Sequence, residues 1–191
     1  MKSINMDPKL VEQIAEHYRA IIQLIGEDPE REGLVKTPTR AAKALIENTR
    51  GYAEDPASIV RAAMFEHEGS DIVIVKDIEF YSLCEHHLLP FFGKVSIGYL
   101  PQGRIVGLSK LGRIVDSFSR RLQVQERLTA EICALLSTEL SDDVIVVCKA
   151  SHMCMQMRGV EKQDAKTVTM HCHGAFEENP ALRAEFLSFI Q

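Results

Sequence analysis

Two short stretches of this chain each bring a cysteine and a histidine together. Cys84 and His87 lie three residues apart, so on a turn the thiolate and the imidazole can face one cation. Far downstream, His152 and Cys154 lie two residues apart, and on a strand their side chains would share a face. Three such ligands with one open position are typical of a catalytic zinc site, whereas four protein ligands fill a structural one. The spacing alone leaves both kinds of site open, and a disulfide between Cys84 and Cys154 is a further alternative.

The number of cysteines bears on the disulfide alternative. The chain of 191 residues has five, an odd number, and we find no signal-peptide pattern near its N-terminus. We therefore expect a cytoplasmic protein with reduced thiols, which argues against a disulfide framework. Cys133 and Cys148 lie among apolar neighbours and are expected in the core. The tract His171-Cys172-His173 has no further ligand nearby in the sequence, so we expect an exposed or interface strand end there.

A second group of residues could bind an anion. Ser109 is expected at the start of a helix, and Lys110 and Arg113, three residues apart, would share a face of its first turn. Free backbone N–H groups, the helix dipole and two cations make a natural phosphate site. A solvated basic face is the alternative, and this segment taken alone favours it.

Gln125 and Glu126 open the next expected helix. A glutamate in a first turn is favourable for the helix dipole alone. Its carboxylate also offers two acceptors, which match the two parallel donors of guanine's Watson–Crick edge, N1–H and the 2-amino group. Gln125 could supplement that contact.

The composition narrows the classes of partner. The net charge is −5, so nothing global recommends a nucleic acid or a membrane surface. No apolar run is long enough to span a bilayer. An anionic small substrate would need a local basic pocket in an acidic protein.

The elements that must position these residues follow a mixed order of helices and strands. Helices are expected at 7–26, from a cap at Thr39 to about 52, at 109–118, from about 124 onward, and at 176–191. Strands are expected at 71–81, 94–100, 143–157 and 166–172, with a short extended run at 105–108 and an irregular segment at 82–92. This order is typical of an α+β fold built on antiparallel pairs. The length suits one compact domain, with an N-terminal helical segment at 1–70 and a catalytic region at 71–191.

Four motifs in this order resemble those of the GTP cyclohydrolase I family. They are Ser82-Leu-Cys-Glu-His-His, Gly107-Leu-Ser-Lys-Leu-Gly-Arg-Ile-Val, Gln123-Val-Gln-Glu-Arg-Leu-Thr and His152-Met-Cys-Met-Gln-Met-Arg-Gly. The likeness runs from about Thr37 to the C-terminus. The four ordered motifs together are highly specific, whereas any one of them alone would not be.

The resemblance implies a role for each motif residue. Zinc would be bound by Cys84, His87 and Cys154, and the proton-transfer histidines would be His86 and His152. Guanine would be held by Gln125 and Glu126. The triphosphate would be held by Ser109, Lys110, Arg113 and Arg158, with Arg40 and Lys43 added from a neighbouring subunit.

The family's reaction converts GTP and water into formate and 7,8-dihydroneopterin triphosphate, the entry to folate or tetrahydrobiopterin synthesis. Zinc would activate the water that attacks C8, while a histidine protonates N7 because the leaving nitrogen must not depart as an anion. A second hydrolysis would release C8 as formate. The ribose would then open, rearrange and reclose on the exposed amines.

The resemblance also implies the tunnelling fold, in which antiparallel sheets of several subunits join into a barrel. Two pentamers would stack into a homodecamer, with active sites at subunit interfaces. A non-catalytic binding or regulatory relative with a structural zinc is one alternative, although such a protein would be expected to lose His86, His152 or Glu126. A tunnelling-fold enzyme that uses Cys84 as a nucleophile, such as a nitrile reductase, is another, and it would not require His87 and Cys154.

Overall fold

The computed structural model describes residues 6–191 and divides into two compact units, one up to Arg50 and one from Gly51 to Gln191. The first unit holds two helices, α1 (Pro8–Leu24) and α2 (Thr37–Asn48). The side chain of Asp7 caps α1 by accepting a hydrogen bond from the backbone of Lys9. The helix expected at 7–26 is thus confirmed.

The start of the second helix differs from the expectation. Thr39 was expected to cap it, but α2 begins at Thr37, with Lys36 at the N-cap position. The reason is Pro38, because the φ angle of proline is already helical. Proline also has no backbone N–H, but in the first turn of a helix that group has no partner in the helix anyway. Thr39 therefore lies inside the helix.

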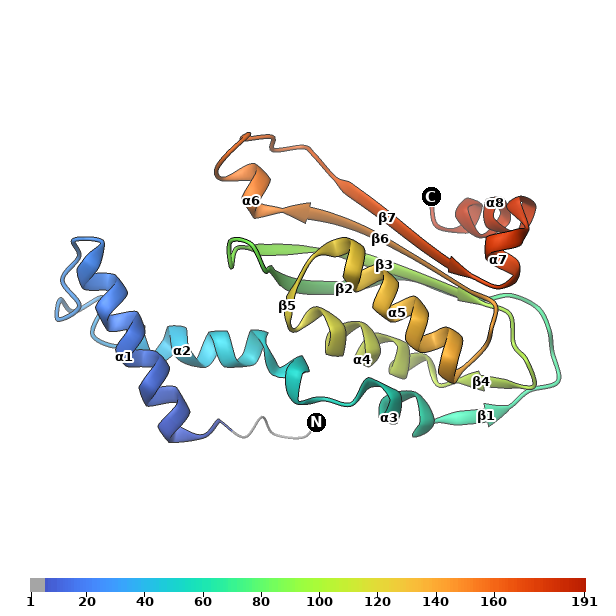
Figure 1. The fold of residues 1–191 in the computed structure, drawn as a ribbon, viewed down its shortest axis with the longest axis horizontal. Coiled ribbons are helices and arrows are strands. Elements are labelled where there is room, and N and C mark those ends of the chain that lie inside the picture. Colours follow the sequence, from blue (N-terminus) through green and yellow to red (C-terminus); the bar gives the residue numbers. More distant parts are fainter. Residues whose placement is uncertain (1–5) are drawn as a thin grey trace. The chain divides into compact units, whose positions relative to one another are not determined.

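The second unit is built on a five-stranded sheet with the order β5-β2-β3-β6-β7 (Figure 1). Antiparallel pairing joins β2 to β3, β3 to β6 and β6 to β7, whereas the short β5 runs parallel to the end of β2. The strands are β2 (Val73–Cys84), β3 (Pro90–Tyr99), β5 (Leu122–Gln123), β6 (Val144–His152) and β7 (Thr167–His173). A separate two-stranded sheet pairs β1 (Met64–Glu66) with β4 (Arg104–Val106). The expected α+β class is confirmed.

Helices cover both faces of this sheet. The longest, α4 (Leu108–Ser119) and α5 (Gln125–Glu139), lie side by side on one face (Figure 1). Successive side chains of β6 point to opposite faces of the sheet, and both faces are buried. Val144, Val146 and Cys148 belong to the core cluster on the α4–α5 face. On the other face, Ile145 and Val147 pack with Phe176 and Phe186 of the C-terminal helices. The shorter helices are η1 (Arg50–Ala53), α3 (Pro56–Arg61), α6 (Met153–Gln156), α7 (Ala175–Glu178) and α8 (Pro180–Phe189).

Two predicted boundaries near the functional motifs are wrong. The segment 82–92 is irregular only at 85–89, since β2 runs through Cys84 and β3 starts at Pro90. The strand expected at 143–157 ends at His152, where its pairing with Phe91 of β3 also ends. Beyond that point the methionine-rich chain has no partner strand and turns into α6, since methionine and glutamine are good helix formers.

The short elements α3 and β1 were not predicted from the sequence. The predicted boundary between residues 70 and 71 stays a prediction, while the packing units divide between Arg50 and Gly51. Among residues 6–191, no helix is long and apolar enough to cross a bilayer.

Candidate active site

The three predicted zinc ligands converge in the second unit. Cys84 ends β2, His87 lies in the turn that follows, and Cys154 lies in α6. Their ligand atoms are all within 4.8 Å of one another. Two sulfurs and one imidazole nitrogen are a donor set found in catalytic zinc sites, so these residues fit a zinc ion with one position left for another ligand.

The turn after β2 explains why Cys84 and His87 meet. The carbonyl of Cys84 accepts hydrogen bonds from the backbone N–H groups of His87 at 3.3 Å and Leu88 at 2.8 Å. The backbone N–H of Cys84 donates to the carbonyl of Leu89 at 2.9 Å. Leu88 has a φ of 55°, in the left-handed region, which reverses the chain within a few residues. The Nδ1 atom of His87 is thereby 3.9 Å from the sulfur of Cys84.

The electrostatics of the two thiols favour a cation between them. Burial raises the pKa of the Cys154 thiol, and the adjacent Cys84 sulfur raises it further, while the charge of Arg158 lowers it. Two neighbouring thiols resist double ionisation because their negative charges repel. A bound cation removes that repulsion and makes both sulfurs strong ligands.

An ion pair anchors the metal-ligand turn to the start of α5. The carboxylate of Glu85 accepts a hydrogen bond from the guanidinium of Arg127, which lowers the pKa of Glu85. Arg127 also donates to the Gln123 side chain at 2.9 Å, and the backbone of Glu85 donates to the carbonyl of Gln123 at 3.0 Å. Sequence reasoning missed this pair, since no local pattern joins residues 42 positions apart.

His152 is held away from the three ligands by a different set of contacts. Its Nε2 atom lies 2.8 Å from Oε1 of Gln125. Its ring stacks on that of Phe91, with centroids 4.8 Å apart and planes inclined by 3°. Phe91 lies opposite His152 in the β3–β6 register. Burial lowers the pKa of His152, opposed by the charge of Glu126. His152 is therefore a half-buried imidazole whose burial favours the neutral ring.

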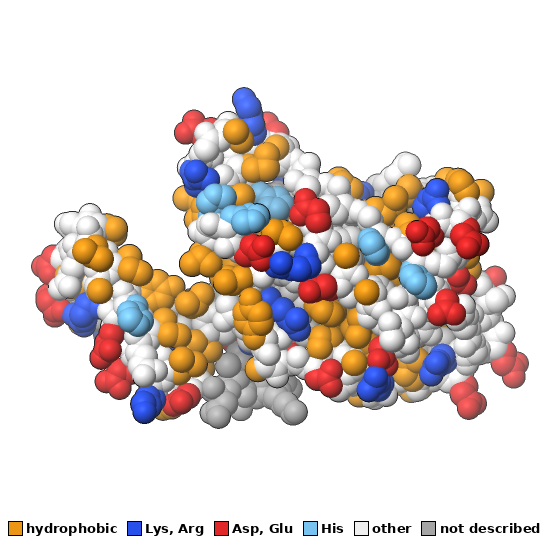
Figure 2. Space-filling view, in the orientation of Figure 1, with side chains coloured by type: hydrophobic (Ala, Val, Ile, Leu, Met, Phe, Trp, Pro, Cys, Tyr) orange, Lys and Arg blue, Asp and Glu red, His pale blue; other side chains and the backbone are white. Residues whose placement is uncertain are grey.

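His86 is exposed, as is its neighbour His87. The Nδ1 atom of His86 is 3.9 Å from the sulfur of Cys84, and its Nε2 atom is 3.9 Å from a carboxylate oxygen of Glu85. Figure 2 shows histidine side chains gathered near α6, with charged side chains of both signs beside them. The site thus combines a metal-ligand cluster with one exposed and one half-buried imidazole, which suits metal-assisted chemistry with proton transfer.

Comparison with known proteins identifies the family. A family model described as GTP cyclohydrolase I matches residues 14–191 of this chain. The chain belongs to the GTP cyclohydrolase I family.

Curated relatives of the family cover nearly the whole chain. A protein named GTP cyclohydrolase 1 from Porphyromonas gingivalis is 58% identical over 93% of this chain and 92% of its own. One of the same name from Bacteroides fragilis is 54% identical over 95% of this chain and 93% of its own. The Drosophila melanogaster protein of that name is 50% identical over 95% of this chain and 56% of its own. Among solved structures, the archaeosine synthase QueF-Like in the apo form covers 56% of this chain and 98% of its own, with a TM-score of 0.46 and 18% identity.

The residues that the GTP cyclohydrolase I resemblance assigns to the triphosphate lie at two places in the second unit. Ser109, Lys110 and Arg113 belong to the first turns of α4, where Ser109 and Arg113 are exposed. The helix starts at Leu108, one residue before the expected start. Arg158 lies after α6 and is exposed. Its Nη1 atom is 3.0 Å from Nε2 of His87.

The contact between Arg158 and His87 depends on which nitrogen carries a hydrogen. A guanidinium can only donate, so Nε2 of His87 accepts here with its lone pair. A neutral imidazole that binds a cation through Nδ1 carries its hydrogen on Nε2 and cannot accept. Cation binding at Nδ1 of His87 would therefore release Arg158, leaving its guanidinium able to meet an anion.

The two residues assigned to guanine differ in exposure. Glu126 is exposed in the first turn of α5. Gln125 is only 1% exposed, and both ends of its amide are hydrogen-bonded within the protein. A contact of the Gln125 side chain with guanine would require these bonds to break, so this assignment stays a prediction.

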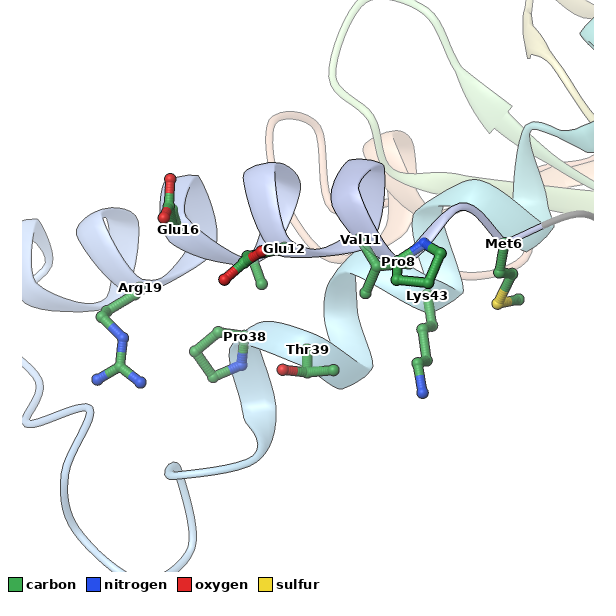
Figure 3. Close-up of a pocket in the computed structure, with 10 residues that line it drawn as sticks. Met6, Pro8, Val11, Glu12, Glu16, Arg19, Pro38, Thr39 and Lys43 are labelled. Carbon is green, nitrogen blue, oxygen red and sulfur yellow. The ribbon is translucent and has the colours of Figure 1, made fainter.

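Arg40 and Lys43 belong to the first unit, on α2, and both are exposed. Lys43 borders a hollow of about 600 Å³ between α1 and α2, which is lined also by Val11, Glu12 and Arg19 (Figure 3). Their contribution to a triphosphate site stays a prediction.

The remaining cysteines and histidines lie as expected. Cys133 and Cys148 are buried core residues. His171 and His173 are exposed at the end of β7, and Nδ1 of His173 is 2.7 Å from the carbonyl oxygen of Asp142. All five cysteines are free thiols.

Proposed function

We propose that this protein is a GTP cyclohydrolase I, which hydrolyses GTP at C8 to formate and 7,8-dihydroneopterin triphosphate, the first step of folate or tetrahydrobiopterin synthesis. The observation that carries the proposal is the convergence of Cys84, His87 and Cys154, with His86 3.9 Å from the sulfur of Cys84. It occurs in a chain that is 58% identical to a curated GTP cyclohydrolase 1.

The metal would be zinc, held by Cys84, His87 and Cys154. When bound, zinc supplies Lewis-acid activation of water for attack on a carbon such as C8. The turn 85–89 and the Glu85–Arg127 ion pair hold two of the ligands in place. Cys154 approaches from α6, so the site combines two segments of the second unit that lie far apart in the sequence.

The two histidines would carry the protons. Hydrolysis at C8 breaks its bond to a ring nitrogen, which must be protonated as it leaves. His152 suits the role of a base, because its burial favours the neutral ring. His86, exposed beside Glu85, could deliver a proton to N7 or to the ribose.

Glu126 would read the base and a set of cations would hold the phosphates. The exposed carboxylate of Glu126 offers two acceptors to N1–H and the 2-amino group of guanine. The side chain of Gln125 could supplement this contact only if its hydrogen bonds inside the protein broke. The α4 N-terminal turns supply backbone N–H groups and two cations. The residues proposed at the triphosphate are Ser109, Lys110, Arg113 and Arg158, with Arg40 and Lys43 from a neighbouring subunit.

The assembly would be the tunnelling-fold barrel and homodecamer of the family. Two long strands of the five-stranded sheet leave a backbone edge unpaired in the described part of the chain. They are β7, and β2 apart from its last two residues, which pair with β5. Joining one edge to the other between copies is a head-to-tail contact, which closes into a ring when the rotation permits. We expect the protein in the cytoplasm, with no nucleic-acid or membrane partner.

The decisive experiment follows both products. Purified zinc-loaded protein with GTP should give formate and a dihydropterin in equal amounts, the latter fluorescent after oxidation and dephosphorylation. An 8-oxo-GTP analogue keeps the guanine edge and the triphosphate but blocks C8, so it should compete with GTP and release no formate. Formate from the analogue, or GTP consumption without formate, would refute the mechanism. A zinc-containing chain without turnover would favour a non-catalytic relative.

A further inference from the structure

The buried amide of Gln125 ties together three secondary-structure elements. Gln125 is the first residue of α5. Its Nε2 atom lies 3.0 Å from the carbonyl oxygen of Cys148 in β6, 3.1 Å from that of Thr167 in β7, and 3.2 Å from the hydroxyl of Thr169. Its Oε1 atom faces Nε2 of His152 at 2.8 Å. The side chain is thus fully engaged inside the protein.

The direction of every hydrogen bond around Gln125 follows from its partners. Backbone carbonyl oxygens only accept, so the amide hydrogens of Gln125 must face Cys148 and Thr167. The Thr129 hydroxyl donates to the carbonyl of Gln125 at 2.8 Å, so in its 2.6 Å contact with Thr169 it must accept. Thr169 then donates to Thr129, and its oxygen, 3.2 Å from Nε2 of Gln125, shares one of the two amide hydrogens with a carbonyl oxygen. All these bonds agree on one orientation of the amide, with Oε1 towards His152.

This orientation decides where the hydrogen of the neutral His152 ring lies. An amide oxygen has only lone pairs to offer, so the Nε2 atom of His152 must carry the hydrogen of their 2.8 Å bond. Stacking on Phe91 restricts rotation of the ring that would exchange its two nitrogens. Among residues 6–191, Nδ1 of His152 has no hydrogen-bond partner within the protein.

We propose that Gln125 is a positioning residue for His152, which fixes the ring as the Nε2–H tautomer by accepting the hydrogen of Nε2 and leaves the unpartnered Nδ1 as the nitrogen that faces substrate. In this bond the hydrogen belongs to Nε2 of His152, and Oε1 of Gln125 accepts it. The catalytic part rests on the proposed function, whereas the tautomer does not.

The tautomer can be measured without substrate. Zinc-loaded protein labelled with ¹⁵N-histidine gives distinct signals for protonated and bare ring nitrogens, and His152→Ala identifies the signals of His152. We expect a protonated Nε2 and a bare Nδ1 in the neutral ring. A bare Nε2, or an equal mixture of tautomers, would overturn the proposal even if the protein hydrolyses GTP. The tautomer itself is read from the wild-type protein, and the variant serves only to assign the signals.

Kinetics then separate positioning from contact with the base. Gln125→Met removes the acceptor for His152 at similar side-chain length. We expect kcat to fall by at least about tenfold, and at most by the roughly 10²–10⁴-fold that general acid–base catalysis contributes. The KM for GTP should stay within about twofold of the wild-type value. The matched control Thr169→Val removes one acceptor of the same amide but leaves the bond to His152, so it should keep the tautomer and most of kcat. A raised KM with unchanged kcat in Gln125→Met would assign Gln125 to guanine instead.

Discussion

Individual residues of the metal-ligand cluster differ greatly in exposure, although they would share one ion. Cys84 is buried, Cys154 is half-buried and His87 is exposed. We expect Cys84→Ala, His87→Ala and Cys154→Ala each to lose zinc and activity together, because three protein ligands leave none to spare. The measurement is zinc per chain by atomic spectroscopy beside the formate assay.

The matched control for these variants is Cys172→Ala. Cys172 is a half-buried free thiol in β7 that does not belong to the cluster. It should keep one zinc per chain and full turnover. A metal-free cluster variant with wild-type activity would contradict the assignment, and so would zinc loss in Cys172→Ala.

Glu126 offers a test of base recognition at one position. Glu126→Gln replaces one acceptor with a donor that would face a donor of guanine, which costs about 1–3 kcal/mol or more when the mismatch is buried. The loss of its favourable charge in the first turn of α5 should cost only about 0.3–1 kcal/mol of stability. We expect a raised KM for GTP with little change in the unfolding midpoint.

Inosine triphosphate serves as the internal control for Glu126, because it lacks the 2-amino group. The wild-type enzyme should favour GTP over inosine triphosphate, and Glu126→Gln should lose much of that preference. An unchanged preference would mean that Glu126 does not read the base and serves the helix dipole alone.

At the scale of elements, β6 links the core to the site, and its core thiol gives a pH prediction. Burial raises the pKa of the Cys148 thiol from 9.0 to about 12. As pH rises past 9, the unfolded chain loses this proton first, while the folded chain keeps it until about pH 12. The free energy of unfolding should therefore fall over this window by about 1.4 kcal/mol per pH unit for this thiol, with the stabilisation complete below pH 9.

The measurement is urea unfolding of wild type and Cys148→Ala at several pH values between about 8 and 10. The variant should show a shallower fall of the unfolding free energy above pH 9. Burial also raises the pKa of the Cys133 thiol to about 12. Part of the fall of the unfolding free energy with pH should therefore remain in the variant. Parallel curves for the two proteins would contradict the burial effect at Cys148.

Helices and strands could be predicted where the periodicity of apolar residues within one segment was enough to identify them. The apolar period from Leu128 to Leu136 indicated α5, and the alternation before Leu100 indicated β3. The continuation of β6 through Met157 was wrongly predicted, because the end of the strand depends on where β3 stops pairing, which no local pattern reveals. The α3 and β1 segments are too short to show a period.

The candidate site was predictable by residue type more than by geometry. The local spacing of Cys84 and His87 sufficed to suggest a shared cation. His152 and Cys154 were expected on one strand face, yet Cys154 joins the cluster from α6 while His152 turns to Gln125. The contacts of Gln125 reach 23 to 44 residues along the chain, so only the folded arrangement of α5, β6 and β7 discloses them.

At the scale of the whole molecule, the five-stranded sheet of the second unit has two long strands, β2 and β7, whose open edges differ in length. β2 has twelve residues, of which Leu83 and Cys84 pair with β5, and β7 has seven. Val168 and Met170 expose apolar side chains on β7. Unpaired edges of this kind are aggregation hazards unless another strand covers them. We propose that other copies of the same chain pair with these edges, since a ring of subunits would join β2 of one copy to β7 of the next.

A pair of proline variants in β7 separates this ring from the fold of one chain. Successive residues of an antiparallel strand direct their backbone N–H groups to opposite sides, so of Met170→Pro and His171→Pro one removes a bond to β6 and the other blocks the free edge. We expect one variant to lower the unfolding temperature strongly. The other should fold near normally but lower the mass of the assembly in sedimentation, and turnover should fall with that mass because residues of neighbouring subunits would complete the site. A monomeric wild-type protein, or two variants that both keep the wild-type mass, would refute the ring.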